Sequence, residues 1–202
     1  MAIQTIITDL GGVFVLQAER PQRQDWEQRS GITERALFRL IDKAGLAQAA
    51  DVGKITSSEV WQHMAEKTGL DVQLLREVQE GLFAAEYINQ PLADFFQSLR
   101  PRYKIVAISN AWSYVHTSLE SKFNLSQYFD EQFFSCEVGL AKPDIAIYQF
   151  VLHSLQVDPT RTIFLDNKID NVDSAQIIGM NSIHYRQNDQ AIAAIKKILE
   201  QA

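Results

Sequence analysis

Cysteine is almost absent from this sequence of 202 residues, which contains only Cys136. A lone cysteine forms no intrachain disulfide bond and is typical of proteins in reducing compartments. A chain of this length buries roughly 70% of its unfolded surface on folding, enough for a core that needs no disulfide or metal. We therefore expect one ordinary globular protein, located in the cytoplasm.

Basic residues are also few: 19 Lys and Arg stand against 25 Asp and Glu, a net charge of −6. Nucleic acids and anionic membranes are held mainly by clustered basic side chains, so neither is an expected partner. The apolar stretch from Ile3 to Val15 follows no basic residue and contains Asp9, unlike a secretory signal. No other run is long enough to span a bilayer. Small molecules are the expected partners, and the sequence indicates no oligomeric state.

Short runs rich in β-branched residues indicate a parallel sheet. The first, Ile-Gln-Thr-Ile-Ile-Thr at residues 3–8, stops at an Asp-Leu-Gly-Gly turn, as expected for a buried strand. Later runs alternate with helix-like sequence, which is typical of right-handed strand–helix–strand units. We expect further strands at residues 103–108, 132–135, 162–165 and 181–185.

The sequence between the first strand and about residue 90 has a different period, with apolar residues recurring every three or four positions. This spacing predicts amphipathic helices over residues 34–43, over residues 57–67 and from residue 71 onward. Thr33, Ser57 and Asp71 are the expected N-caps. The predicted architecture is α/β: a Rossmann-like parallel sheet core of residues 1–15 and 90–202, with an α-helical cap, residues 16–89, inserted after the first strand.

Polar side chains stand where the predicted strands end, and ligands of parallel α/β sheets bind beyond the carboxyl ends of the strands. Taken singly, each is explained as a turn residue, a helix cap or a solvated charge. The positions are Asp9, Ser109-Asn110, Lys142 before Pro143, and Asp166-Asn167.

Together, in order and spacing, these positions resemble the four motifs of the haloacid dehalogenase superfamily, whose members are hydrolases with an aspartate nucleophile. The resemblance covers the whole chain, and the helical insertion falls where this family carries its cap. The matching segments are Ile-Ile-Thr-Asp-Leu-Gly-Gly-Val at residues 6–13, Ser109-Asn110, Lys142-Pro143, and Phe-Leu-Asp-Asn at residues 164–167 with Asp170-Asn171.

The resemblance implies that Asp9 is the nucleophile and that Ser109 and Lys142 hold the transferred group. These roles suit the chemistry, because a carboxylate can form a covalent intermediate while an ammonium and a hydroxyl stabilise anionic oxygens. Backbone N–H groups in the glycine turn can add donors. The implied substrate-binding residues are Leu10, Gly11, Ser109, Asn110 and Lys142.

The family's phosphatases hold Mg²⁺ through the nucleophile, a backbone carbonyl two residues later and an acid of the fourth motif. In this chain that implies Asp9, the Gly11 carbonyl, and Asp166 or Asn167, all oxygen donors of the kind that Mg²⁺ prefers. Asn167 stands where the family commonly has a second aspartate. Asp166 then supplies the negative charge on that side.

Gly11 is a second departure, because the family's phosphatases usually carry there an aspartate that protonates the leaving group. Loss of a general acid typically lowers the rate about 10²- to 10⁴-fold. Subgroups with Asp-Leu-Gly-Gly at this turn nevertheless resemble sugar-phosphate phosphatases. The loss matters least for good leaving groups, such as those of anomeric or acyl phosphates.

The resemblance thus implies a Mg²⁺-dependent phosphatase that acts on a small phosphorylated metabolite, with sugar phosphates as a candidate class, through an aspartyl-phosphate. Two alternatives stay open: a metal-free 2-haloacid dehalogenase-type hydrolase, and a catalytically impaired relative that binds ligands. Dehalogenases of the family typically carry Ser-Ser-Asn at the fourth motif. Asp166 therefore favours the metal site.

Some further residues have two readings. Arg20 and Arg23 could meet an anionic substrate with two-pronged hydrogen bonds or form a solvated basic entrance. Trp112 could line the pocket or pack under the cap. The four histidines show no metal-ligand spacing.

Overall fold

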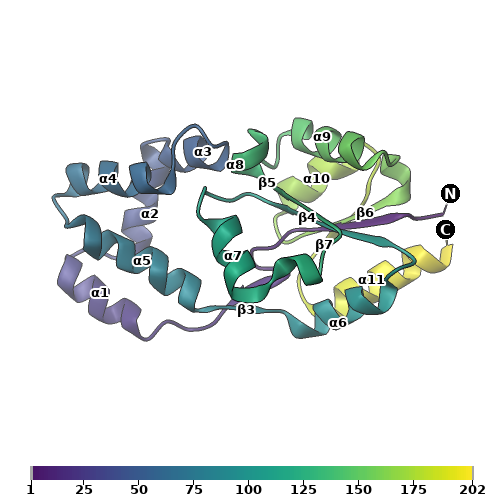
Figure 1. Ribbon diagram of the computed structural model, residues 1–202, viewed down its shortest axis with the longest axis horizontal. Helices are drawn as coiled ribbons and strands as arrows, with labels where there is room; N and C mark the ends of the chain where they lie inside the picture. The colour runs from purple at the N-terminus through teal and green to yellow at the C-terminus, as the bar shows by residue number, and fades with distance from the viewer. Residues whose placement is uncertain (1, 202) are drawn as a thin grey trace.

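The computed structural model describes residues 2–201 and contains a five-stranded parallel sheet covered by helices on both faces (Figure 1). The strands lie in the order β5-β4-β1-β6-β7, so that β1 is central. Each strand overlaps its predicted range, and the α/β Rossmann-like fold class is confirmed. The strands are β1 (Thr5–Thr8), β4 (Lys104–Ser109), β5 (Glu131–Phe134), β6 (Thr162–Asp166) and β7 (Asn181–His184).

Each face of the sheet has its own apolar core, because successive side chains of a strand point to opposite faces. Ile6 packs with α6 (Gln90–Leu99), α7 (Val115–Phe123) and α11 (Asn188–Gln201). Ile7 packs with α9 (Ile145–Leu155) and α10 (Ile169–Ile177). Both isoleucines are fully buried. The remaining short helices are η1 (Leu125–Gln127), α8 (Ser135–Val138) and η2 (Pro159–Arg161).

A tight turn follows β1 and carries the chain away from the sheet. The carbonyl oxygen of Leu10 accepts the backbone N–H groups of Val13, Phe14 and Val15 at 3.2, 2.9 and 2.8 Å. Gly12 adopts φ +79° within the turn, a conformation that costs glycine little. This turn fixes the backbone next to Asp9.

A two-stranded antiparallel ribbon links the sheet to the helical insertion, and the sequence analysis did not predict it. The strand β2 (Val15–Gln17) pairs with β3 (Glu86–Ile88). The chain therefore leaves the sheet and returns to it through adjacent strands. The buried amide of Asn89 joins the two, since its Nδ2 donates to the Val13 carbonyl at 2.7 Å and its backbone N–H donates to the Phe14 carbonyl at 2.9 Å.

Five helices form the insertion, which lies at the left of Figure 1. Their apolar faces enclose a separate core that includes Leu37, Trp61, Met64 and Leu75. The fold class with an inserted helical cap is confirmed, whereas the boundaries at residues 15/16 and 89/90 stay a prediction. Among residues 2–201, no helix is both long enough and apolar enough to cross a membrane. The cap helices are α1 (Gln22–Ser30), α2 (Glu34–Lys43), α3 (Leu46–Asp51), α4 (Ser57–Thr68) and α5 (Val72–Ala84).

The N-caps of the cap helices agree with two of the three expectations. The side chains of Thr33 and Asp71 accept backbone N–H groups at the starts of α2 and α5. The expected cap Ser57 is wrong, because Thr56 caps α4. Thr56 and Glu59 form a reciprocal capping box, in which each side chain accepts the backbone N–H of the other residue. Ser57 is instead the first helical residue.

The cap contacts the core through the loop between α3 and α4 and the start of α4. The backbone N–H of Ser57 donates to Ser113 Oγ of the core at 3.1 Å. The rings of Trp61 and Trp112 lie 5.7 Å apart, centroid to centroid. Gly53 lies directly against the backbone of Cys136, and a Cβ atom at this glycine would overlap the Cys136 carbonyl.

Substitution of Gly53 should therefore destabilise the junction of cap and core. Gly53→Ala combines a positive φ of +69° with a steric clash; the control Gly31→Ala, at φ +71°, meets no atom within 4 Å. We expect a loss of about 1–2 kcal/mol in the free energy of unfolding for the control, and about 1–3 kcal/mol more for Gly53→Ala. Urea denaturation measures both values. Equal losses would contradict the tight contact.

Candidate active site

Three of the predicted site residues meet at the carboxyl edge of the sheet. Asp9 directly follows β1, while Ser109 ends β4 and Asp166 ends β6, the two strands that flank β1. Lys142 reaches them from the loop before α9. All four residues are buried, with 7% or less of each exposed.

The ammonium of Lys142 lies between two carboxylates. Its Nζ donates to Asp9 Oδ1 at 2.6 Å, to Asp166 Oδ2 at 2.8 Å and to the Ile108 carbonyl at 2.9 Å. All three donor positions of the ammonium are therefore used. The two carboxylates and one ammonium leave a net charge of −1 in a buried site, which suits a site that also admits a cation.

The electrostatics of this cluster follow from burial and from the neighbouring charges. Burial raises the pKa of Asp9, and the negative charge of Asp166 raises it further, against the lowering effects of Lys142 and the Leu10 backbone N–H. Burial alone would lower the pKa of Lys142, but the two carboxylates raise it above its ordinary value. Lys142 is thus held as an ammonium.

Asp166 is fixed by two more donors. Its Oδ1 accepts the Lys168 backbone N–H at 2.8 Å, and its Oδ2 accepts Asn171 Nδ2 at 2.9 Å. Asn171 is itself buried, and its carbonyl accepts the Tyr148 hydroxyl at 3.0 Å. The sequence analysis included Asn171 in the fourth motif without a role. In the structure it orients Asp166.

Asn110 was expected to bind substrate, but the structure uses its amide to hold Lys142. Asn110 Nδ2 donates to the Lys142 carbonyl at 2.7 Å, and the Lys142 backbone N–H donates to Asn110 Oδ1 at 2.8 Å. Ser135 holds Ala111, the residue after Asn110, because Ser135 Oγ accepts the Ala111 backbone N–H at 2.9 Å. The loop that follows Ser109 is therefore tied to the loop that carries Lys142.

The candidate metal ligands offer oxygens of the type that Mg²⁺ prefers. They include two carboxylates, those of Asp9 and Asp166. The described residues contain no group of three or more His, Cys, Asp or Glu placed to hold a metal. Asn167 Oδ1 is buried without a hydrogen-bond partner in the described structure, so its lone pairs are free. Asn167 Nδ2 faces the Gly11 carbonyl at 3.4 Å, which places this side chain beside a second expected ligand. These oxygen ligands fit a hard cation, and only two of them, the Asp9 and Asp166 carboxylates, carry a negative charge.

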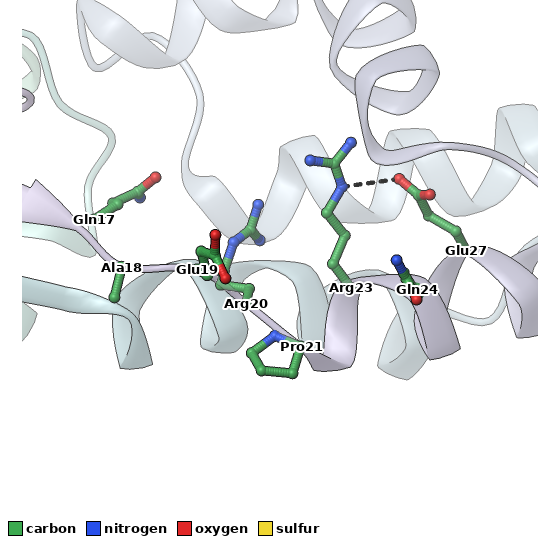
Figure 2. Close-up of a pocket in the computed structure, with 8 residues that line it drawn as sticks. All are labelled: Gln17, Ala18, Glu19, Arg20, Pro21, Arg23, Gln24 and Glu27. Carbon is green, nitrogen blue, oxygen red and sulfur yellow. Dashed lines mark hydrogen bonds and ion pairs between the residues drawn. The ribbon is translucent and has the colours of Figure 1, made fainter.

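The two arginines after β2 are paired with acidic residues of the cap. Arg20 Nη2 lies 2.5 Å from Glu34 Oε1, and Arg23 Nε lies 3.0 Å from Glu27 Oε1. Figure 2 shows Arg20 and Arg23 pointing to the same side as Gln17, into a cavity of about 790 Å³ lined by residues between Gln17 and Glu27. The cavity wall carries both signs of charge, so it is not a purely basic entrance. Trp112, for which the sequence left two roles open, packs against Trp61 of the cap.

A buried aspartate beside a lysine and a second aspartate, at the strand ends and next to a helical cap, defines the chain as an α/β enzyme with a carboxylate-based site. Residues 3–179 match the haloacid dehalogenase-like hydrolase family, and the chain belongs to this family. It is therefore a hydrolase, and the resemblance found in the sequence is confirmed.

Known relatives support both the family and the fold. The chain is 26% identical to bifunctional epoxide hydrolase 2 of Rattus norvegicus over 98% of its own length, but spans only 39% of that protein. It is 24% identical to a D-ribitol-5-phosphate phosphatase of Bacteroides thetaiotaomicron, over 89% of this chain and 90% of that protein. A haloacid dehalogenase family enzyme of the same bacterium, solved with magnesium and inorganic phosphate, has the same fold, with a TM-score of 0.75, 22% identity, and coverage of 92% of this chain and 95% of that one.

Removal of the Lys142 charge should cost far more stability than removal of an exposed lysine. Lys142→Met leaves two buried carboxylates without their cation, which should lower the free energy of unfolding by about 3–5 kcal/mol. The control Lys104→Met breaks the Lys104–Glu131 pair, whose side chains are 41% and 40% exposed, and should cost at most about 1 kcal/mol. Denaturation in the presence of a chelator measures both. A Lys142→Met loss no larger than the control would contradict the bridging role.

Proposed function

We propose that this chain is a Mg²⁺-dependent phosphatase of small phosphorylated metabolites that works through an aspartyl-phosphate on Asp9. The observation that carries the proposal is the cluster of Asp9, Lys142 and Asp166, which combines a carboxylate nucleophile, a cation for anionic oxygens and a second carboxylate for a metal. The likeness to a D-ribitol-5-phosphate phosphatase along most of both chains supports a phosphorylated sugar or polyol as substrate.

In the first step, a carboxylate oxygen of Asp9 attacks the phosphorus atom and the bond from phosphorus to the leaving oxygen breaks. Lys142 already contacts Asp9 Oδ1 at 2.6 Å, so its ammonium is placed to orient the nucleophile and, through its positive charge, to stabilise the transferred group. The hydroxyl of Ser109, at the end of β4, is a second donor for the anionic oxygens. Water then attacks the phosphorus atom, releases phosphate and restores Asp9.

The residues that would hold Mg²⁺ are Asp9, the Gly11 carbonyl, Asp166 and Asn167. The bound ion would offset the negative charge of the phosphoryl group and of the two carboxylates. Asp166 also favours this proposal over metal-free dehalogenase chemistry, because dehalogenases of the family typically carry Ser-Ser-Asn at the fourth motif, and because Lys142 alone leaves the two buried carboxylates with an excess negative charge. Asn171 and the Lys168 backbone N–H keep its carboxylate in place.

The nucleophile is tested by Asp9→Asn, since an amide does not replace a carboxylate in the covalent step. We expect phosphate release to fall to background with an unchanged circular dichroism spectrum. Asp25→Asn is the control, because it makes the same change at a side chain that is 68% exposed on α1; it should keep full activity. More than a few per cent of wild-type activity in Asp9→Asn would contradict the role of Asp9.

The metal is tested by a Mg²⁺ titration of three proteins. Wild type should need Mg²⁺ and saturate at a comparatively high concentration, because Asp9 and Asp166 are the two charged groups among the implied ligands. Asn167→Asp adds a charge and should lower the concentration that gives half-maximal activity, while Asp166→Ala should lose most of the Mg²⁺-dependent activity. Full phosphate release in excess chelator would contradict the metal site, and halide release from a short 2-haloacid in excess chelator would support the dehalogenase alternative.

A further inference from the structure

A buried pair of amides joins the end of the β2–β3 ribbon to the start of the last helix. Asn89 directly follows β3, and Asn188 is the first residue of α11. Asn89 Nδ2 donates to Asn188 Oδ1 at 2.8 Å, and Asn188 Nδ2 donates back to Asn89 Oδ1 at 2.8 Å. The Tyr185 hydroxyl, which comes from the residue after β7, lies 3.0 Å from Asn89 Nδ2 and donates to Asn188 Oδ1 at 2.9 Å. We call these three residues the brace.

One end of the brace holds the turn that follows the nucleophile. Asn89 Nδ2 donates to the Val13 carbonyl at 2.7 Å, and the Asn89 backbone N–H donates to the Phe14 carbonyl at 2.9 Å. The backbone N–H groups of Val13 and Phe14 in turn donate to the carbonyl of Leu10, the residue after the nucleophile. Gly11, whose carbonyl is an implied metal ligand, lies inside this turn. The brace therefore supports the backbone that presents a ligand.

The other end of the brace holds the strand that carries the second carboxylate. The backbone N–H of Tyr185 donates to the Asp166 carbonyl at 2.8 Å, and the Tyr185 side chain belongs to the brace. Both Asn89, 2% exposed, and Tyr185, 9% exposed, are buried, and buried polar groups are costly unless they are hydrogen-bonded. A fully paired polar network of this kind favours one arrangement of the segments that it joins.

We propose that the brace positions the Mg²⁺ ligands, because it links the turn that contains the Gly11 carbonyl to the strand end that carries Asp166. The inference rests on the proposed phosphatase function. Lys142 already joins the carboxylates of Asp9 and Asp166, whereas a backbone carbonyl is placed only by the backbone around it. Mg²⁺ requires near-ideal octahedral geometry at short distances. A small displacement of one ligand therefore weakens its binding. The members of the brace are positioning residues and not ligands.

Asn188→Ala tests the brace, because it removes one amide of the pair and leaves the turn and Asp166 unaltered. The dissociation constant for Mg²⁺, measured by calorimetry without substrate, should rise about 10-fold. Saturating Mg²⁺ should restore most of kcat, since the nucleophile and Lys142 are intact. The matched control is Asn181→Ala, at the amino end of the same strand β7, whose amide donates to two backbone carbonyls at 3.0 and 3.1 Å. The control should bind Mg²⁺ like the wild type.

Tyr185→Phe is the milder variant and decides the matter if Asn188→Ala fails to fold. It removes the hydroxyl but keeps the ring and the backbone N–H, so Mg²⁺ binding should weaken by about two- to fivefold, the equivalent of one hydrogen bond. Tyr103→Phe is its control, because Tyr103 is equally exposed at 9% and its hydroxyl forms no hydrogen bond within residues 2–201.

Urea denaturation without Mg²⁺ separates positioning from stability. A merely structural role lowers the free energy of unfolding in Asn188→Ala and leaves the dissociation constant for Mg²⁺ unchanged. If the wild type binds Mg²⁺ and releases phosphate while Asn188→Ala and Tyr185→Phe bind Mg²⁺ like their controls, the brace alone is overturned. A wild type that neither binds Mg²⁺ nor releases phosphate from a monoester would overturn the proposed function as well.

Discussion

The ammonium of Lys142 holds two buried carboxylates together at the carboxyl edge of the sheet, and the rest of the site is arranged around this contact. Asp9 and Asp166 come from neighbouring parallel strands, β1 and β6, whose ends meet because of the sheet register. Two buried carboxylates repel each other strongly, because little water is present to screen their charges. A cation between them offsets this repulsion. Lys142, with 1% of its side chain exposed, provides that cation.

The position of Lys142 depends in turn on the backbone around it. Asn110 makes two hydrogen bonds to the Lys142 main chain, and the Ile108 carbonyl accepts from Nζ. The segment from Ile108 to Asn110, at the end of β4, therefore sets both ends of the lysine. The same segment continues to Trp112 and Ser113, which contact the cap. The loop that follows β4 therefore contacts both the cap and the segment that holds Lys142.

The sequence predicts the elements whose signal is local. The central strands are continuous apolar runs, and α2, α4 and α5 have a clear apolar period, so these elements were predicted. The cap helices α1 and α3 were not predicted. The ribbon of β2 and β3 was missed because each strand is three residues long and gains its stability from pairing Val15 with Ile88, far along the chain. Thr56 and Ser57 are equally good caps by type, and only the spacing to Glu59 favours Thr56.

Within the site, the residue types were predictable but several of their partners were not. Asp9, Lys142 and Asp166 stand out because charged residues at strand ends are costly unless they are used or paired. The amide of Asn110 looks like a ligand-binding group in the sequence, whereas its hydrogen bonds go to Lys142, 32 positions away. No local pattern encodes such a pairing.

The central claim is that Asp9 carries the phosphoryl group during turnover, and it is tested most directly by trapping the intermediate. Enzyme in steady-state turnover of a phosphate monoester with Mg²⁺ would be quenched rapidly in acid, digested and analysed by mass spectrometry. The account predicts a phosphoryl group on the peptide that contains Asp9, and its absence from unreacted enzyme. Sustained turnover with Asp9 unmodified at every quench time, or a phosphoryl group on another residue, would contradict it.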